Sequence, residues 1–393
     1  MRKISIWLAG ALVLAAIIVT FMTTSFLFLR HRDVPQDKLL EAADLIEASF
    51  IGDSDREAMT DAAISAMVES LGDRWSYYLT AEQMEQYRAY ESNQYKGLGL
   101  VVKSGEDGGV VIHAVYPVSP AGEAGILPGS RIIRVAMVDT RSATLNEALE
   151  LVRNGIEAGR VELSLQEPDG EMRDVTLIPG YVDTDPVSWA MLPDGLGYIR
   201  IENFEDRSGD LAISAAEELC SQGAQGLVFD VRGNPGGQLQ QLLKLLDRLL
   251  PKGALFISKD IQGKVETEYS DDDCLSVPMA VLVNSDSYSA AEFFAAALQE
   301  YEWATVVGEQ TTGKGYAQVT LMLSDGSAIH ISTVEYFTPQ GKNLDGTGLT
   351  PDLEVDLDEE QRQELAYGTL TPEKDAQLQA ARNVLLDKIG NKP

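Results

Sequence analysis

The sequence predicts a multidomain protein of mixed α/β and α+β class, because its hydrophobic pattern changes character several times along the chain. An apolar N-terminal segment precedes a region of helical periodicity, a region of short β-type runs, and a region where strands and helices alternate. The chain has 393 residues and 45% are hydrophobic, so two or three domains with sizeable cores are expected. The changes in pattern place the parts at residues 1–32, 33–92, 93–182, 183–357 and 358–393.

Residues 1–32 have the composition of a signal anchor. Arg2 and Lys3 precede an unbroken run of apolar and small residues from Ile4 to Leu29, and basic residues follow it. At about 1.5 Å per helical residue, this run can span a bilayer core of roughly 30 Å. A cleaved secretory signal has a shorter apolar stretch and a small-residue cleavage site, so we predict an uncleaved transmembrane helix. Both flanks are basic, so charge leaves the orientation open.

The next two parts differ in periodicity. Residues 33–92 carry apolar side chains at helical spacing, and Thr80 with Gln83 three residues later predicts the start of a helix through a capping box. Residues 93–182 read as a small β-rich module with one helix. Its expected strands and helix are Gly99–Val102, Val110–Ala114, Arg131–Val135, Val161–Leu165 and the helix Leu145–Arg153.

Residues 183–357 alternate strands and helices, which predicts an α/β domain. The expected elements are the strands Gly197–Ile201, Gly226–Val231 and Met279–Asn284 and the helices Asp210–Cys220, Leu239–Leu250 and Ala290–Gln299. The last part, 358–393, is charged and helix-prone, and Asp375–Ile389 is its best helix candidate.

Composition excludes several classes of function. A net charge of −30 repels nucleic acid and anionic membrane surfaces, so neither is an expected partner of the folded body. Cys220 and Cys274 lack zinc-type spacing, and we interpret them as two unrelated thiols, although one bridge between them stays open. None of the three histidines has a metal-type partner spacing. We therefore expect no metal or other cofactor, and a mechanism that does not use histidine is favoured.

Ser289 is a candidate nucleophile. It follows an apolar β-type run and a short polar turn, and it begins an alanine-rich helical stretch. Helix N-termini offer unpaired N–H groups, so the Ala290 N–H could hold an oxyanion together with an N–H of the Gly236-Gly237 pair. The local sequence alone favours a simpler role for Ser287 or Ser289 as a helix cap.

Lys314 is a candidate general base. A lysine can act as a base once burial has lowered its pKa from the ordinary value near 10.4, and the Gln318 amide could orient it. An alternative is a P-loop, because Gly308, Gly313 and Lys314 have the right spacing. However, Gly315 stands where a P-loop needs Ser or Thr, and a strand-like segment follows it. A solvated loop lysine is the remaining interpretation.

Several motifs in order resemble the carboxyl-terminal processing peptidases, which are serine proteases with an embedded PDZ domain and a Ser-Lys-Gln centre. The resemblance covers nearly everything after the apolar segment. The motifs are Leu71–Leu79 (LGDRWSYYL), Tyr95–Leu100 (YKGLGL), Ser119–Gly129 (SPAGEAGILPG), Asp230–Gly237 (DVRGNPGG), Ser287–Glu292 (SYSAAE) and Glu335–Gly341 with Pro351-Asp352.

The resemblance implies a role for each matched residue. Residues 183–357 would form the α/β peptidase core of the tail-specific protease type, and 93–182 would be the PDZ domain. The implied catalytic residues are Ser289 as nucleophile, Lys314 as base and Gln318 as the residue that orients the lysine. Gly236, Gly237 and Ala290 would supply the oxyanion hole, and Leu98, Gly99 and Leu100 would form the PDZ carboxylate-binding loop.

The chain departs from the family pattern at a few positions. Gly129-Ser130 stands where the family often has Gly-Asp, and a glycine usual near Asp139-Thr140 is missing, which affects the fine geometry of the PDZ domain. The small residue that usually precedes the nucleophile is Tyr288 here, and we expect it to narrow the cleft.

The resemblance therefore implies a single-pass membrane protein with its catalytic domain outside the cytoplasm. It would bind the C-terminal ends of extracytoplasmic proteins and cleave them. The main alternative is a non-catalytic PDZ adaptor, and a P-loop NTPase is a weaker one. Protein substrates with free C-termini and the membrane are the expected partners. The helical N- and C-terminal segments are candidate homodimer contacts, whereas the substrate and the oligomeric state stay open.

Overall fold

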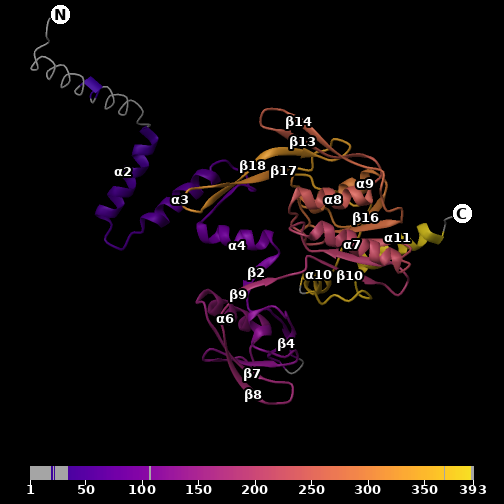
Figure 1. The fold of residues 1–393 in the computed structure, drawn as a ribbon, viewed down its shortest axis with the longest axis horizontal. Helices are drawn as coiled ribbons and strands as arrows, with labels where there is room; N and C mark the ends of the chain where they lie inside the picture. Colours follow the sequence, from indigo (N-terminus) through magenta and orange to yellow (C-terminus); the bar gives the residue numbers. More distant parts are fainter. Residues whose placement is uncertain (1–18, 21, 23–33, 106–107, 367, 391–393) are drawn as a thin grey trace, which may run out of the picture. The chain divides into compact units, whose positions relative to one another are not determined.

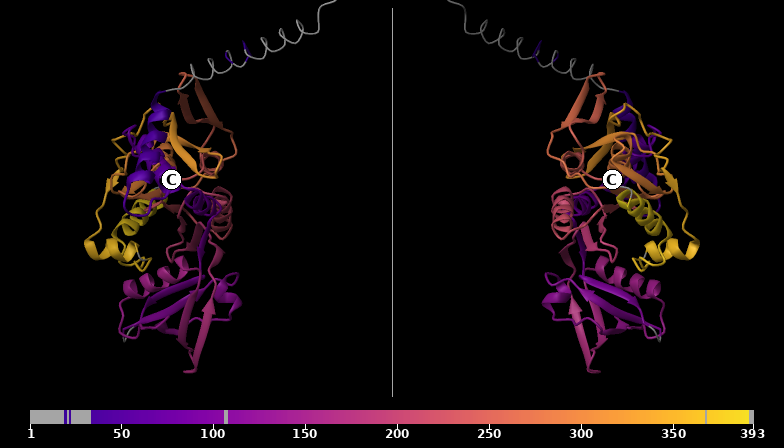
Figure 2. Two further views of the ribbon diagram at one scale, coloured as in Figure 1. Left: turned by 90° about the vertical axis from the view of Figure 1, so that its left-hand side faces the viewer. Right: turned by 90° about the vertical axis from the view of Figure 1, so that its right-hand side faces the viewer.

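The computed structural model describes residues 19, 20, 22, 34–105, 108–366 and 368–390, and its elements are shown in Figures 1 and 2. The contacts divide the chain into two compact units, Met1–Tyr78 and Leu79–Pro393. The segment predicted to be the membrane anchor lies almost entirely outside the described residues. Within the described part of the chain, no helix is long and apolar enough to cross a membrane.

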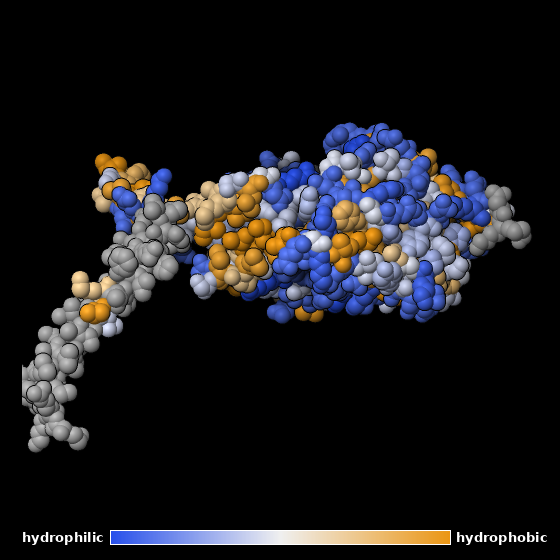
Figure 3. Space-filling view, turned by 90° about the horizontal axis from the view of Figure 1, so that it is seen from above, coloured by the Kyte–Doolittle hydropathy of each residue, from blue (hydrophilic) through white to orange (hydrophobic). Residues whose placement is uncertain are grey.

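The first unit contains helices α2 (Val34–Ser49) and α3 (Arg56–Glu69). Asp55 caps α3 by accepting hydrogen bonds from two N–H groups of its first turn, and Arg56 forms ion pairs with two acidic residues of α2. Apolar side chains remain exposed on α2, and the space-filling view shows hydrophobic surface there (Figure 3). They are Leu39, Leu40, Leu45 and Ile46.

The second unit begins with helix α4 (Ala81–Glu91), which has the predicted capping box between Thr80 and Gln83. After α4 the chain enters and leaves a small β module through one antiparallel strand pair, β2 (Gln94–Gly97) with β9 (Gly180–Asp183). The entry and the exit of the module are thus hydrogen-bonded to each other.

The β module between these strands is a mostly antiparallel sheet with one covering helix. The strand order is β3-β4-β5-β7-β8, with the short β6 paired to β5, so β3 lies at an edge. Its core is apolar and includes Ile112 and Leu165, both 0% exposed. The elements are β3 (Leu100–Ser104), β4 (Val110–Val115), α5 (Pro120–Glu123), β5 (Arg131–Val135), β6 (Val138–Asp139), α6 (Leu145–Glu157), β7 (Val161–Gln166) and β8 (Met172–Leu177).

The two departures from the family pattern in this module are accommodated by hydrogen bonds. The buried Ser130 hydroxyl donates to the Glu167 carboxylate at 2.9 Å. The buried Thr140 hydroxyl donates to the Ile132 carbonyl at 2.8 Å. Neither polar group therefore has to be buried without a partner.

A six-stranded sheet forms the centre of the second unit, in the order β10-β11-β12-β15-β16-β19. The strands from β11 to β19 are parallel, and β12 and β15 are buried on both faces, which explains their unbroken apolar sequences. The strands are β10 (Val187–Met191), β11 (Gly197–Ile201), β12 (Leu227–Asp230), β15 (Met279–Val283), β16 (Ala304–Gly308) and β19 (Leu353–Glu354).

Helices cover both faces of this sheet. The helices α7 (Ser208–Ser221), α8 (Leu239–Leu249) and α9 (Ala290–Glu300) pack on one face in the largest apolar core. The opposite face is covered by α11 (Ala376–Gly390), whose Leu378, Ala381 and Leu385 pack against it. A shorter helix, α10 (Glu359–Ala366), precedes α11.

A second sheet of antiparallel strands adjoins the α/β core. Strand β18 (Ala328–Phe337) pairs with both β17 (Tyr316–Met322) and β13 (Gly253–Asp260), and β13 pairs with β14 (Val265–Ser270). The observed elements confirm the expected helices and strands to within a few residues. The β13–β14 hairpin was not predicted, because β14 is largely polar and exposed and β13 has its apolar residues in one run, Ala254–Ile257, without alternation.

Candidate active site

Ser289 lies at the turn from strand β15 into helix α9. Its backbone has φ 57° and ψ −122°, a left-handed conformation that is rare for a residue with a side chain. Two hydrogen bonds fix this turn to the segment that follows strand β12. The Ser287 hydroxyl donates to the Val231 carbonyl at 2.8 Å, and the Tyr288 N–H donates to the Asn234 carbonyl at 3.1 Å. A half-buried serine is thus held in a strained strand-to-helix turn, a feature that clusters at functional sites.

The glycine loop after strand β12 lies directly against this turn. A β-carbon on Gly236 would lie 2.8 Å from the Ser289 β-carbon and 2.9 Å from the Ala290 nitrogen, so only glycine fits there. The Gly236 N–H already donates to the Asn234 side chain at 2.8 Å. Among the described residues we find no acceptor for the N–H groups of Gly237 and Ala290. These two N–H groups are therefore the ones available to an oxyanion.

Lys314 lies between strands β16 and β17, and its backbone is tied to that of Ser289 by one carboxylate. The Glu292 Oε2 atom accepts hydrogen bonds from the Ser289 N–H at 3.0 Å and from the Lys314 N–H at 2.9 Å. Its Oε1 atom accepts from the Gly313 N–H at 2.6 Å and from the Thr311 hydroxyl. Glu292 is fully buried, which raises its pKa, and these hydrogen bonds act in the opposite direction.

Tyr336 gives a second link between the two residues. Its hydroxyl donates to the Lys314 carbonyl and is also in hydrogen-bonding contact with the Ser289 side chain. The ring is 4% exposed, and burial raises the pKa of its hydroxyl above the usual range. Tyr336 therefore stays a neutral hydrogen-bonding group beside Ser289.

Gln318 lies on strand β17, opposite Ser332 of β18. Its side-chain amide nitrogen donates to the Tyr316 carbonyl at 2.8 Å and to the Ser332 hydroxyl at 2.9 Å. With the nitrogen held in this way, the amide oxygen is the atom that could accept a hydrogen bond from a lysine amine.

His330 lies close enough to Lys314 for the lysine charge to affect its titration. Burial and then Lys314 lower the pKa of His330 to about 4, so its ring is neutral at neutral pH. The ring contacts Tyr87 at 5.7 Å between centroids, and its Nδ1 lies 2.9 Å from the Thr320 hydroxyl. No sequence pattern indicates that a histidine lies near the candidate base.

The chain is similar in sequence to a family of known peptidases. The family description "Peptidase family S41" matches residues 195–355. The chain is 30% identical over 328 residues to the carboxy-terminal processing protease CtpA of Bacillus subtilis, covering 82% of this chain and 69% of that one. It is 32% identical over 334 residues to the carboxyl-terminal-processing protease of Synechocystis, covering 83% and 77%. The chain belongs to peptidase family S41.

Solved structures agree with the assignment of this chain to family S41. The photosystem II D1 C-terminal processing protease is similar to it with a TM-score of 0.51 and 27% identity, over 88% of this chain and 99% of that one. An S41 protease from Bacteroides fragilis shares the fold with a TM-score of 0.56 at 18% identity. The S41 peptidase thus has the mixed α/β fold of its family and belongs among its carboxyl-terminal processing proteases.

The P-loop interpretation of the Gly308–Lys314 segment is wrong for this peptidase. A P-loop leads into a helix whose N-terminus binds phosphate, whereas this segment leads into strand β17. Gly315 is also closely packed, since a β-carbon there would lie 2.3 Å from the Asn343 side-chain oxygen. Cys220 and Cys274 are both free thiols, as their interpretation predicted.

A second candidate site of the peptidase lies in the β module. Leu98, Gly99 and Leu100 connect strand β2 to the edge strand β3. The Leu98 and Gly99 carbonyls accept hydrogen bonds from the N–H groups of Ala121 and Tyr116, both at 2.9 Å. Beside this loop, a cavity of about 340 Å³ separates β3 from helix α6. Apolar side chains line most of it, with Lys96 and Arg153 among the lining residues.

Sequence reasoning missed two residues that organise the active site. Glu292 carries a local signal, because it stands three residues after Ser289 in the spacing of a capping box. Its hydrogen bonds to Gly313 and Lys314 join helix α9 to the loop between β16 and β17. These residues are about twenty positions apart in the sequence, so no local pattern could reveal the bonds. Tyr336 stands in the motif Glu335–Gly341, which by itself assigns it no role.

Proposed function

We propose that this S41 peptidase is a membrane-anchored serine endopeptidase that binds C-terminal ends of extracytoplasmic proteins and cleaves them with Ser289, Lys314 and Gln318. The observation that carries the proposal is the shared Glu292 oxygen, which holds the backbones of Ser289 and Lys314 together. The N–H groups of Gly237 and Ala290 lie beside this pair, where an oxyanion would form.

In this mechanism the Ser289 Oγ forms a bond to the scissile carbonyl carbon, and its proton passes to the neutral Lys314 amine. The carbonyl electrons move onto the oxygen, which the Gly237 and Ala290 N–H groups stabilise. Collapse of the intermediate breaks the C–N bond, and the Lys314 ammonium gives its proton to the leaving amine. Water, activated by the same lysine, then hydrolyses the acyl-enzyme and frees Ser289.

We assign residues 93–182 as a PDZ domain that selects the substrate. A peptide could add as a strand to the open edge of β3, with its terminal carboxylate bound by the N–H groups of Leu98, Gly99 and Leu100. The apolar cavity between β3 and α6 would take the terminal side chain, so an apolar C-terminal residue is favoured.

The remaining parts of the proposal rest on the sequence. Residues 1–32 would anchor the chain, with the catalytic domain outside the cytoplasm, and no metal or nucleotide takes part in the mechanism. The exposed apolar side chains of α2 support the N-terminal segment as a homodimer contact.

The test compares Ser289→Ala and Lys314→Arg with the parent on a peptide that ends in a free apolar residue. Both variants are expected to lose cleavage, because arginine stays protonated and cannot act as a base. Ser285→Ala, an exposed serine in the same turn, is the matched control and should cleave as the parent does. The same peptide with an amidated C-terminus should be cleaved poorly.

A serine-directed phosphonate gives the second readout. It should label the parent and Ser285→Ala but not Ser289→Ala. Cleavage that survives in Ser289→Ala would contradict the mechanism. Peptide binding by the parent without cleavage or labelling would favour the non-catalytic adaptor.

A further inference from the structure

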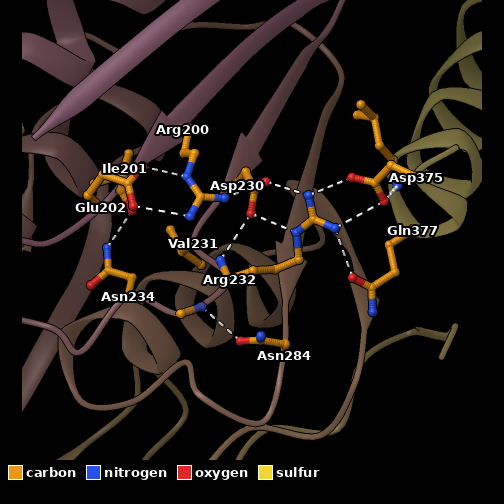
Figure 4. A network of polar contacts seen from close by, with 12 residues as sticks. Arg200, Ile201, Glu202, Asp230, Val231, Arg232, Asn234, Asn284, Asp375 and Gln377 are labelled. Carbon is orange, nitrogen blue, oxygen red and sulfur yellow. Dashed lines mark hydrogen bonds and ion pairs between the residues drawn. The ribbon is translucent and has the colours of Figure 1, made fainter. Parts of the chain in front are cut away.

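A buried arginine connects the C-terminal helix to the glycine loop of the active site (Figure 4). Arg232 is 2% exposed and stands just before the loop that runs from Gly233 to Gly237. Its guanidinium donates two hydrogen bonds to the Asp375 carboxylate, at 3.0 and 2.7 Å, and a third to the Gln377 side-chain oxygen at 3.0 Å. Both partners lie where α11 begins and are 4% and 0% exposed.

A second carboxylate holds the other side of the same guanidinium. Asp230, at the end of β12, accepts from Arg232 Nε at 2.9 Å, from Nη2 at 2.6 Å and from the Arg232 N–H at 3.0 Å. Burial alone would raise the pKa of Asp230, but the attraction and hydrogen bonds of Arg232 outweigh it and lower that pKa to about 2. Asp230 is therefore ionised, and Arg232 is held between two carboxylates.

Short hydrogen bonds hold Gly233, Asn234 and Gly236 of the loop that follows Arg232. The Gly233 N–H donates to the Asn284 side chain at 2.8 Å, and the Asn234 amide donates to the Ile201 carbonyl at 2.8 Å. The Asn234 side-chain oxygen then accepts from the Gly236 N–H at 2.8 Å. A displacement of Arg232 would thus be passed along the loop to the Gly237 N–H.

Helix α11 is well placed to set the position of Arg232. Its Leu378 and Ala381 pack against strands β12, β15 and β16, and the first two of these strands lead into the glycine loop and the Ser289 turn. Asp375 also accepts from the Leu378 N–H at 3.0 Å, and the Gln377 amide donates to the Val355 carbonyl at 2.7 Å. The two side chains that hold Arg232 are therefore themselves fixed.

We infer that Asp375 and Gln377 are positioning residues for the oxyanion hole, which hold the Gly237 N–H in place through Arg232. The inference rests on the proposed function, because it assumes that Gly237 stabilises an oxyanion. It gives the start of the C-terminal helix a part in the chemical step, although neither residue touches the substrate.

The test uses the full chain with Asp375→Asn and Gln377→Met. Asp375→Asn keeps the shape but removes the charge. Gln377→Met removes one acceptor of Arg232 together with the donor to the Val355 carbonyl, and leaves both carboxylates in place. The matched control is Arg382→Gln, which breaks a different polar anchor of α11, a 2.7 Å bond to Asp194, without touching Arg232. The measurements are kcat, KM, the pH profile and the affinity for a peptide boronate, whose tetrahedral adduct occupies the oxyanion hole.

Asp375→Asn should lower kcat by roughly 100-fold, the size of a lost oxyanion donor, and leave KM within about twofold. Boronate affinity should fall with kcat, and the alkaline rise of the pH profile, which reports the lysine, should not move. Gln377→Met should lower kcat and boronate affinity by about tenfold, again without moving the pH profile. If Asp375→Asn does not fold, Gln377→Met alone tests the inference. Arg382→Gln should behave as the parent.

Unchanged kcat and boronate affinity in a folded Gln377→Met or Asp375→Asn would overturn the inference. An equal loss in Arg382→Gln would also overturn it, because the effect would then be general loosening of α11. A parent that neither cleaves peptide nor binds boronate through Ser289 would contradict the proposed function itself, and the inference with it.

Discussion

The two halves of the active site are built differently. Ser289, Gly236 and Gly237 follow strands β15 and β12 of the buried parallel sheet, where the Ser287 hydroxyl and the Asn234 carbonyl bond the loops to each other. Gln318 belongs to the antiparallel sheet and Lys314 to the loop that leads into it, and the outward-facing Leu321 of β17 is 52% exposed. The position of the nucleophile is therefore determined by the buried core. The position of the base is determined by the loop that leads into the β17–β18 hairpin and by the backbone bonds of Lys314 to Glu292 and Tyr336.

This difference predicts two kinetic signatures. Changes in the buried half should act on the chemical step without moving the titration of the base. Changes in the hairpin half should move the pH profile as well. The substitutions below test this division, in order of decreasing effect.

Glu292→Gln should have the largest effect, because the Glu292 carboxylate is hydrogen-bonded to both halves. Glutamine keeps the shape but has only one oxygen, so it cannot accept all four hydrogen bonds that the two Glu292 oxygens accept from Ser289, Lys314, Gly313 and Thr311. We expect kcat/KM to fall by roughly 100- to 1,000-fold. Phosphonate labelling of Ser289 should slow by a similar factor. Glu300→Gln, at the other end of α9, serves as the control, and equal losses in both variants would contradict the linking role.

Gln318→Leu should reduce activity by about tenfold, since it removes an orienting group but leaves the base in place. An amide oxygen that accepts from the lysine favours its charged form, so its removal should lower the pKa of the base. Activity needs the neutral amine, and the alkaline rise of kcat/KM should therefore move to lower pH. Val319→Thr, the exposed neighbour on β17, should leave the profile unchanged. A profile that does not move in Gln318→Leu would argue against contact with the base.

How far the sequence reaches can be seen from particular elements. Strand Gly197–Ile201 was predicted with its observed bounds, and the Leu239–Leu250 helix ends one residue earlier, because both have clear apolar periodicity. The β13–β14 hairpin has no such pattern. The motifs indicate which residues line the site, but they do not predict the contacts between those residues. Glu292 of helix α9 bonds Gly313 of a loop that is distant in the sequence, and the docking of α11 brings Arg232 and Asp375 together.

Glu205→Gln should affect stability more than activity. Glu205 is 6% exposed, and among the described residues its Oε2 atom has no hydrogen-bond partner. Burial and then repulsion from Glu91 raise the pKa of Glu205 to about 7. Between its unfolded pKa near 4.5 and about 7, the folded protein keeps a proton that the unfolded chain loses. The free energy of unfolding therefore falls as pH rises through this window.

The glutamine variant should be more stable than the parent at pH 8.5, by up to about 3 kcal/mol, and differ little at pH 4.5. Thermal unfolding at the two pH values measures the difference, with the exposed Asp206→Asn as the control. An equal gain at both pH values would show that the charge of Glu205 is not the cause. Phe204, the neighbour of Glu205, is hydrogen-bonded to the glycine loop, so this pH dependence arises next to the buried half of the site.

At Ser289 the requirements of stability and of activity conflict, because the backbone of this residue is left-handed. A residue with a side chain held at φ 57° costs about 1–3 kcal/mol, and glycine would adopt the same conformation without that strain. A lineage of this protein released from selection for cleavage would gain stability by replacing the serine with glycine. Directed evolution for heat resistance, run without an activity screen, should therefore recover glycine at position 289 and yield a sturdier but inert protein.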